Sequence, residues 1–304
     1  MKSKFLFTAL LAGLCITATG CRSSEKTALG EPQRAKNVKQ TVSVDNITAD
    51  LADADNLLSA QQLISKYGLT GREVPVGKFR NILCEGIVKV FFVPSKHHKV
   101  TVYTNAKTRN YAQVSADGAT LRLSSNNHSH HSIRLNNGDM VLIIVNAPTL
   151  NGLRANGAAT FNTGNITAER FDITLNGATR ASFGTLKTLS ATLNASGASK
   201  FKGDMQGGTS QITLNGAAKA TANITADQLN VTNNGAAQLY LDFKGKTISL
   251  DNNGAAKVEA TLECEQLTAS NNGAAKLRLA GTADDTKIKG AGASSVDTRE
   301  LNKF

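Results

Sequence analysis

Apolar and polar positions alternate through much of the chain, and the alternation recurs at a fixed interval. A Gly-Ala step marks the interval at eight positions, separated by 19 or 20 residues. Counted from each marking glycine, offsets +4 and +6 are mainly apolar, as in Leu239 and Leu241, whereas +3 and +5 are mostly polar. Period-two alternation is typical of a β-strand. The 19-residue copies repeat it at +13 and +15, so each interval contains at least two strands.

A unit this short cannot bury its own apolar face, so neighbouring units must stack on one another. Strands that recur once per unit in one direction stack in parallel, about 4.8 Å apart. The pattern therefore predicts an all-β fold, a parallel β-helix with 19–20-residue coils preceded by a β-rich cap. The predicted structural corners are Gly157, Gly177, Gly197, Gly216, Gly235, Gly254, Gly273 and Gly292.

The residue types at the corner fit a sharp bend. Glycine supplies the positive φ that such a bend needs, and alanine allows coils to approach closely. Six of the eight glycines follow asparagine, which can hydrogen-bond the asparagine one coil away. The step is therefore interpreted as corner architecture and not as a binding site.

The rest of the chain divides by its pattern. Residues 75–149 alternate without a clean repeat and are predicted to be the β-rich N-terminal part or cap of the solenoid. Gly138 and Gly118 lie at repeat spacing before Gly157 and extend the predicted register backwards. Residues 150–304 are the Gly-Ala β-helix, whose last eleven residues break the pattern as a C-terminal cap should.

Residues 21–74 are predicted to be a tether with one possible short helix. The first half of this segment is rich in Lys, Ser, Thr, Gln and Asn, a composition typical of flexible chain. Further on, Leu51, Leu58, Ile64 and Tyr67 mark the short amphipathic helix.

The amino terminus has the pattern of an export signal. Lys2 and Lys4 precede an apolar run from Phe5 to Cys15 that is too short to span a membrane. Residues 1–20 are therefore predicted to be a lipoprotein signal peptide. The signal ends in Ala18-Thr19-Gly20-Cys21, which resembles a bacterial lipobox and makes Cys21 the candidate lipidation site. The alternative is an ordinary secretory signal with an incidental cysteine.

A lipid on Cys21 would hold the protein to a membrane without a spanning helix. The predicted location is the cell envelope, as an outer-membrane lipoprotein that faces either the periplasm or the exterior. In an oxidising envelope Cys84 and Cys264 could pair, but both lie in strand-like runs far apart in the sequence. Two separate buried thiols are the favoured interpretation.

The charge balance allows an acidic partner. Lys+Arg 34 against Asp+Glu 23 gives a formal net charge of +11. Because the chain has no zinc-ligand spacing, basic helix or RNA-binding strand motif, nucleic acid is not a predicted partner. The weak candidates for metal binding are His128, His130 and His131. No cysteine or carboxylate stands beside them, so no metal or cofactor is predicted.

Offset +3 carries a column of basic side chains, one per coil, interrupted by Gln238. Its members are Arg180, Lys200, Lys219, Lys257 and Lys276. They could contact a polyanion such as an acidic glycan, or they could merely keep a long sheet soluble and block lateral pairing. A neutral polar row near +14, from Asp172 to Thr268, could bind sugar hydroxyls, although the chain has no tryptophan for stacking.

Many β-helices cleave acidic polysaccharides, so a lyase or glycosidase is the alternative function. Such a site needs insertions that wall a cleft and two carboxylates that converge. The repeat spacing never exceeds 20 residues, and Asp204, Glu259 and Asp284 fall at different offsets. Nucleophile and phosphate-loop motifs are absent as well. The sequence predicts a non-catalytic protein.

One stretch of the chain carries a family resemblance. It contains Phe79, Ile82, Gly86-Ile87, Val90, Val100 and Val102, then Asn146-Ala147-Pro148-Thr149-Leu150 and the Gly-Ala coils. From about residue 75 to 290 it resembles the family described as “putative auto-transporter adhesin, head GIN domain”, with Gly86-Ile87-Val88 in place of Gly-Ile-Asn.

The resemblance implies a β-helical envelope protein, of a family typical of exported lipoproteins of Bacteroidetes, and brings no catalytic residues. The expected function is to present a repetitive surface, as an adhesin or a module that binds a glycan or another envelope protein. A purely structural envelope spacer is the second alternative.

Overall fold

The computed structural model describes residues 51–125 and 139–302. One helix, α1 (Leu51–Lys66), precedes the strands. The short strands are β1 (Thr70–Val74), β2 (Asn81–Gly86), β3 (Lys89–Pro94), β4 (Lys99–Thr104), β5 (Ala112–Asp117), β6 (Thr120–Ser125), β7 (Leu142–Ala147), β8 (Gly152–Gly157) and β9 (Thr160–Thr163). The remaining strands are β10 (Ile166–Gly177), β11 (Arg180–Ala195), β12 (Lys200–Leu214), β13 (Lys219–Asn233), β14 (Gln238–Gly254), β15 (Lys257–Gly273), β16 (Lys276–Gly292) and β17 (Ser295–Asn302).

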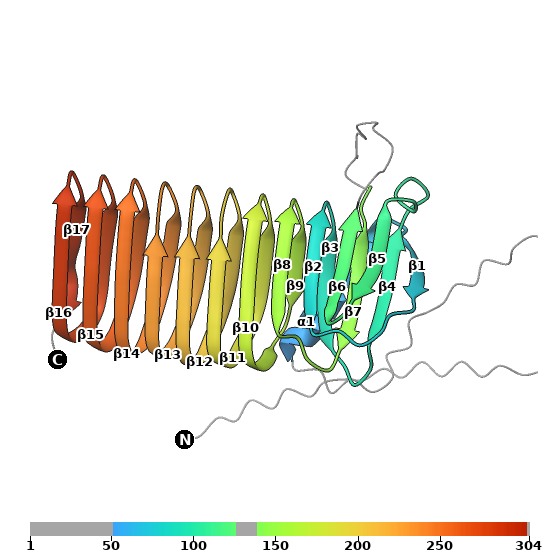
Figure 1. The fold of residues 1–304 in the computed structure, drawn as a ribbon, viewed down its shortest axis with the longest axis horizontal. Coiled ribbons are helices and arrows are strands. Elements are labelled where there is room, and N and C mark those ends of the chain that lie inside the picture. Colours follow the sequence, from blue (N-terminus) through green and yellow to red (C-terminus); the bar gives the residue numbers. More distant parts are fainter. Residues whose placement is uncertain (1–50, 126–138, 303–304) are drawn as a thin grey trace, which may run out of the picture. The chain divides into compact units, whose positions relative to one another are not determined.

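From β10 onward each long strand runs along most of one coil of the solenoid. It pairs in parallel with the long strand of the next coil (Figure 1). The solenoid has about eight turns of about 19 residues, so the predicted parallel β-helix is confirmed. In β14, Leu239 and Leu241 from the first half of the coil and Ile248 and Leu250 from the second half are all buried in one core. The alternation along the sequence thus becomes an inside and an outside for each coil.

The corners line the upper edge of the solenoid in Figure 1, where β8 ends at Gly157. The eight corner glycines have φ between 71° and 86°, the left-handed region that other residues rarely adopt. The backbone N–H of Ala178 donates to the carbonyl oxygen of Gly157 at 2.7 Å, and the same bond recurs at the following corners. A Cβ on Gly177 would lie 2.7 Å from that oxygen, so the corner also requires glycine for space.

The predicted asparagine ladder at the corner is confirmed. Asn176 Nδ2 donates to Asn156 Oδ1 at 3.0 Å, one coil earlier, and Asn253 Nδ2 donates in the same way to Asn234 Oδ1 at 3.1 Å. A second ladder lies inside the last coils, where the buried side chains Asn233, Asn252 and Asn271 bond in series. These bonds satisfy amide groups that would otherwise be costly to bury, and Asn233 Oδ1 at the start of the ladder is left buried without a partner.

At the N-terminal end, the order of the coils in space differs from their order in the chain. β2 pairs in parallel with both β6 and β8, and β3 pairs in parallel with both β7 and β9. The coil of β2 and β3 therefore lies between the β6–β7 coil and the β8–β9 coil. The expected register placed the Gly138 corner before the Gly157 corner. In the structure Gly157 instead pairs with Gly86, so this backward extension of the repeat is wrong. Gly138 lies outside the described residues.

Antiparallel strands end the stack beyond these coils. β4 pairs antiparallel with β7 and with β1, and β5 pairs antiparallel with β6. They form the β-rich cap that was expected. Gly118, which the extended register made a corner, instead lies in the two-residue hairpin turn between β5 and β6 with φ 55°. Glycine suits such a hairpin for the same positive φ, which is why the spacing was misleading.

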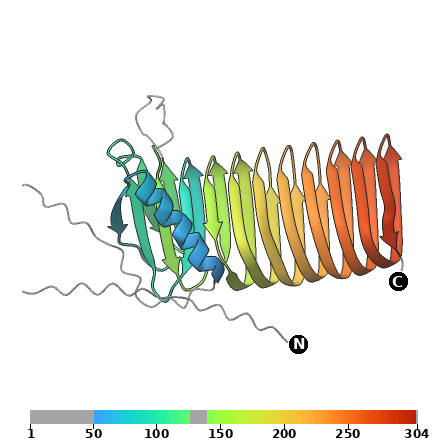
Figure 2. The same ribbon diagram turned by 180° about the vertical axis from the view of Figure 1, so that it is seen from behind.

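The helix covers the outward side of the sheet at this end (Figure 2). Strands that are apolar on both faces need a cover on each. In β3 the side chains of Phe91 and Val93 point away from the solenoid core and pack in a separate cluster with Ala60 of α1. We call the side of the solenoid that carries α1, formed by β3, β7, β9 and the first halves of the later coils, the helix face. The side formed by β2, β6, β8 and the second halves of the coils is the opposite face.

The two terminal assignments need refinement. α1 and β1 both lie within residues 21–74, so regular structure begins before residue 75. At the other end, β17 continues the parallel ladder along the first half of β16 instead of breaking it. The expected C-terminal cap is thus a half coil with charged side chains. In the part of the chain that the structure describes, no helix has the length and apolar character to cross a membrane.

Replacing Gly177 by alanine tests the corner. The left-handed φ should cost a non-glycine residue about 1–3 kcal/mol, and the short approach of the new Cβ to Gly157 adds to that. The urea midpoint followed by circular dichroism should therefore fall. The control is Ala178→Ser, an exposed change at the same corner that should leave the midpoint within error. Equal midpoints for both variants would contradict the corner constraint.

Candidate functional site

The basic column of the sequence forms one straight row on the helix face. Parallel register places each member beside the next, so that Arg180 pairs with Lys200 and Lys200 pairs with Lys219. Gln238 follows, and Lys257 and Lys276 continue the row. Arg180, Lys200 and Lys276 are exposed, while Lys219 and Lys257 are half-buried. Like charges one coil apart in water repel by only about 1 kcal/mol, which the ladder tolerates.

The structure adds two basic residues that the offset rule missed. Lys89 of β3 lies in the same row, reached through Thr160 of β9. Lys202 is exposed in the adjacent row of β12, two residues beyond Lys200. The first could not be found from the repeat because the β2–β3 coil lies outside the regular spacing. The second was visible at offset +5.

The two ends of the helix face differ in charge pairing. Toward the C-terminal end three cations are neutralised, since Lys257 pairs with Glu259 at 2.6 Å, and Lys244 and Arg278 pair with acids of the neighbouring coil. Arg180, Lys200, Lys202 and Lys219 form no ion pair with any described residue. We call these four the free basic cluster. Asp204 is the acid on the same stretch of β12, so this part of the face keeps a net positive charge.

Tyr240 lies between two lysines of the row. Lys219 Nζ is 4.6 Å from the centroid of the Tyr240 ring, and Lys257 Nζ is 5.7 Å from it. Such cation–π contacts hold the ammonium groups in place. The pKa of Lys257 is raised, chiefly by its hydrogen bond with Glu259, so it stays charged.

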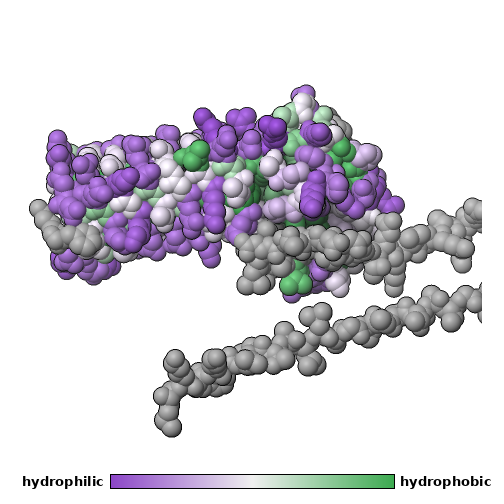
Figure 3. Space-filling view, turned by 90° about the horizontal axis from the view of Figure 1, so that it is seen from below, coloured by the Kyte–Doolittle hydropathy of each residue, from purple (hydrophilic) through white to green (hydrophobic). Residues whose placement is uncertain are grey.

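The opposite face carries the polar row expected near +14. Asp172, Thr192 and Gln211 pair in register, and the row continues to Thr268 and then Lys287. Figure 3 shows the solenoid from below, at the edge between the helix face and the opposite face, where the surface of the coils is mostly hydrophilic with isolated apolar side chains. Leu189 is an exposed large hydrophobic residue, 72% accessible, among the described residues. We see in this row a solvated sheet face.

Both described cysteines are buried free thiols, as predicted. Burial raises the pKa of Cys84, and burial followed by the charge of Asp284 raises that of Cys264 to about 11. Because the thiolate is the reactive form, these thiols are unreactive near neutral pH. They act as small apolar core residues.

The histidine candidates for a metal site, His128, His130 and His131, lie outside the described residues, as does the lipidation candidate Cys21. Among residues 51–125 and 139–302, no group of three or more metal-ligating side chains is assembled. His98 has a packing role, because its ring contacts Phe79 edge-on at 4.8 Å. Its Nδ1 is buried without a hydrogen-bond partner.

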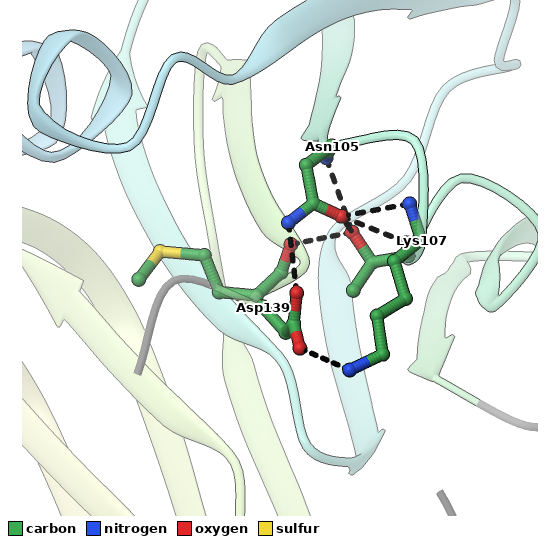
Figure 4. Close-up of polar contacts among 5 residues, drawn as sticks. Asn105, Lys107 and Asp139 are labelled. Carbon is green, nitrogen blue, oxygen red and sulfur yellow. Dashed lines mark hydrogen bonds and ion pairs between the residues drawn. The ribbon is translucent and has the colours of Figure 1, made fainter. Parts of the chain in front are cut away.

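A dense polar cluster near the cap has a structural explanation (Figure 4). Asn105 Oδ1 accepts from the backbone N–H groups of Lys107 and Thr108 at 3.0 and 2.9 Å. Asn105 Nδ2 donates to Asp139 Oδ1 at 3.0 Å, and Lys107 Nζ pairs with the other carboxylate oxygen. Thr108 Oγ1 donates to the carbonyl oxygen of Met140. The cluster ties the turn after β4 to the segment that enters β7 and leaves Asp139 neutralised.

Comparison with known proteins places these features in a family. The family model described as “Putative auto-transporter adhesin, head GIN domain” matches residues 78–246 and 229–303. A solved structure of a “putative lipid binding protein” from Parabacteroides distasonis is 16% identical, with a TM-score of 0.64 over 78% of this chain and 96% of that chain.

Two further solved structures are described as “putative adhesin”. The protein from Parabacteroides distasonis is 18% identical with a TM-score of 0.61, and the one from Bacteroides fragilis is 18% identical with a TM-score of 0.53. Each match covers 75% of this chain and 96% of the other chain. At these identities the likeness shows a shared fold. No curated protein matches the chain.

The pKa of His98 is below its ordinary value because burial, and then the charge of Lys78, disfavour the imidazolium form. Unfolded His98 takes up a proton below about pH 6.5, whereas folded His98 does so only at lower pH. The free energy of unfolding should therefore fall as the pH falls from 7.5 to 5.5. In His98→Gln this decrease should be smaller, as measured by urea unfolding at both pH values. His97→Gln, at an exposed neighbour, should behave like the wild type; equal slopes for all three proteins would refute the role of His98.

Proposed function

We propose a function for this chain, which belongs to the family described as “putative auto-transporter adhesin, head GIN domain”. It is a non-catalytic adhesion module of the cell envelope. The solenoid would present its helix face to an acidic glycan, with the basic row as the contact. The observation that carries this proposal is the free basic cluster. Four cations without ion-pair partners stand on three successive coils of a rigid ladder.

The geometry of the row suits a linear polyanion. Adjacent cations are one coil apart, about 4.8 Å, so they can follow a chain with closely spaced carboxylates or sulfates. The backbone ladder fixes this spacing before binding, which lowers the entropic cost of ordering the site. Contacts to a polyanion at exposed lysines are screened by salt. The proposal therefore makes the interaction salt-dependent.

Three features support a binding role over the alternative of a lyase or glycosidase. Glu259, Glu263 and Glu300 on the helix face are each ion-paired with a cation. The hydrogen bond from Lys257 lowers the pKa of Glu259, which does not suit a general acid that must hold a proton near neutral pH. The repeated coils also hold their 19 or 20 residues without an insertion that could wall a cleft.

The envelope location in this proposal rests on the amino-terminal sequence. Cys21 would carry the lipid, and residues from there to α1 would act as the tether. The adhesin description of the family supports an exported or envelope-associated protein. The description “putative lipid binding protein” belongs to a different solved structure from Parabacteroides distasonis.

Neutralising the free basic cluster tests the glycan contact. The triple variant R180Q/K200Q/K219Q should bind heparin or polygalacturonate on the order of ten-fold more weakly than wild type, because exposed ion pairs contribute up to about 1 kcal/mol each. Binding is measured by biolayer interferometry at 50 and 300 mM NaCl. The matched control R154Q/K287Q/K289Q removes three cations from the opposite face and should retain affinity. If the two triple variants bind alike, the basic row is only a solubilising feature.

The lipid anchor is tested by fractionation. Wild-type protein should sediment with membranes, and mass spectrometry should find a diacylglycerol-modified Cys21. Cys21→Ala should move the protein to the soluble fraction, since nothing else would hold it to the bilayer. Cys15→Ala, within the apolar run, should change neither result. A Cys21→Ala protein that stays with the membranes would disprove this anchor.

A further inference from the structure

A polar groove runs along the helix face over the C-terminal coils, beside the basic row. Lys219 of the free basic cluster borders it, since its Nζ lies 4.6 Å from the centroid of the Tyr240 ring. Its floor is a row of short side chains from three successive coils, Asn223, Asp242 and Thr261. The strand register places each beside the next. The groove opens on both sides of this floor, into lobes of about 280 and 650 Å³. Volumes of this order match those of small-ligand sites.

The groove exists because side-chain length alternates across the face. On one side of the floor the wall consists of Tyr240, Glu259 and Arg278, which are in register with one another. On the other side Lys244 and Glu263 form the wall. Both walls follow the direction in which the coils stack. A ligand in the groove would therefore lie across several coils and meet the same kind of environment once per coil.

The charges of the walls largely cancel. Lys244 Nζ is 2.6 Å from Glu263 Oε1, and Arg278 Nη2 is 2.7 Å from Glu300 Oε1. Glu259 is paired with Lys257 of the basic row. The carboxylate of Asp242 on the floor has no ion-pair partner among the described residues. An anionic chain would meet Asp242 at close range, so the groove disfavours the polyanion that the basic row would attract.

We propose that this groove binds a linear neutral polysaccharide laid along the coils. A carboxylate such as Asp242 accepts hydrogen bonds from sugar hydroxyls, and the Thr261 hydroxyl can both donate and accept. Asn223 Nδ2 already donates to Asp204 Oδ1 at 2.8 Å, so Asn223 offers its Oδ1 and its second N–H. The coil spacing of about 4.8 Å is close to the length of one pyranose unit in an extended chain. Successive sugars can therefore meet successive coils. Tyr240 adds an aromatic side chain to the wall.

The groove is assigned binding and not cleavage. Cleavage of a glycosidic bond needs one carboxyl group that is protonated near neutral pH beside a second that is ionised. The other two acids that line the first lobe are ion-paired, Glu259 with Lys257 and Glu300 with Arg278, and the hydrogen bond from Lys257 lowers the pKa of Glu259.

Isothermal titration with cellohexaose, xylohexaose, mannohexaose, laminarihexaose and chitohexaose tests the proposal on the purified full chain. At least one should bind, with equal affinity at 50 and 300 mM NaCl. Asp242→Ala should weaken binding about ten-fold because it removes a charged hydrogen-bond acceptor. Thr261→Trp should abolish binding by filling the floor.

The controls use the opposite face. Asp251→Ala and Thr268→Trp make the same chemical changes at exposed positions there, and both should bind like wild type. The R180Q/K200Q variant, which leaves the contact of Lys219 with Tyr240 intact, should keep its neutral-sugar binding, and this separates the site from the acidic-glycan contact. The proposal would be overturned if none of the five sugars binds, if the affinity depends on salt, or if Thr261→Trp and Thr268→Trp lose binding equally. Release of shorter sugars during titration would overturn the assignment to binding alone.

Discussion

The hydrogen bond between corner peptides of adjacent coils is the constraint on which the structure depends. At the corners from Gly177 to Gly273 the alanine N–H donates to the glycine carbonyl of the coil before it, at 2.7 Å between Ala178 and Gly157 and 2.7 Å between Ala274 and Gly254. That approach brings backbone against backbone and leaves no room for a side chain. Once the corner is fixed, the register of the strands on either side is fixed too. The same offset then lies in the same row along the solenoid, whether the row is core or surface.

This constraint explains why the sequence predicts the repeated part of the fold so well. A fixed distance between corners, with period-two alternation between them, leaves little choice other than parallel stacking. The basic row was predictable for the same reason, because residues at one offset must be neighbours. The asparagine ladder follows from the residue before each glycine. None of these inferences requires knowledge of contacts between distant residues.

The N-terminal coils show where such reasoning ends. The sequence marks the β2–β3 coil with Gly86 alone, and the coil beyond it has Ser125 in place of a corner glycine. Ser125 Oγ accepts a hydrogen bond from the backbone N–H of Ile87 at 2.7 Å, so a side chain takes over part of the corner's role. A repeat read along the chain assumes that successive coils are neighbours in space. Here one coil is inserted between two later ones, and only pairing between distant segments reveals it.

The surface features of the candidate site follow from side chains that share a face, not from a motif. The repeat aligns Lys257 and Glu259 two positions apart on one strand, so their ion pair could have been anticipated. The contact of Lys219 with Tyr240 and the groove over Asp242 depend on rows in adjacent coils and on side-chain length. As a result the helix face has three zones: apolar strands under α1, a free basic cluster, and an ion-paired groove. A rigid ladder can hold such zones in a fixed order.

Pulsed electron–electron spin resonance between labels at Ile87→Cys and Ala274→Cys tests the account most directly. Both positions are exposed, and Cys15 and Cys21 would be replaced by alanine, while Cys84 and Cys264 are buried. Each corner glycine stacks on the corner glycine of the neighbouring coil, from Gly86 through Gly157 to Gly273. The two labelled corners are therefore seven coil steps apart, or roughly 34 Å. A narrow distribution near that distance is the predicted result. A distance of roughly 43 Å, which the coil order of the sequence would give, or a broad distribution would contradict the account.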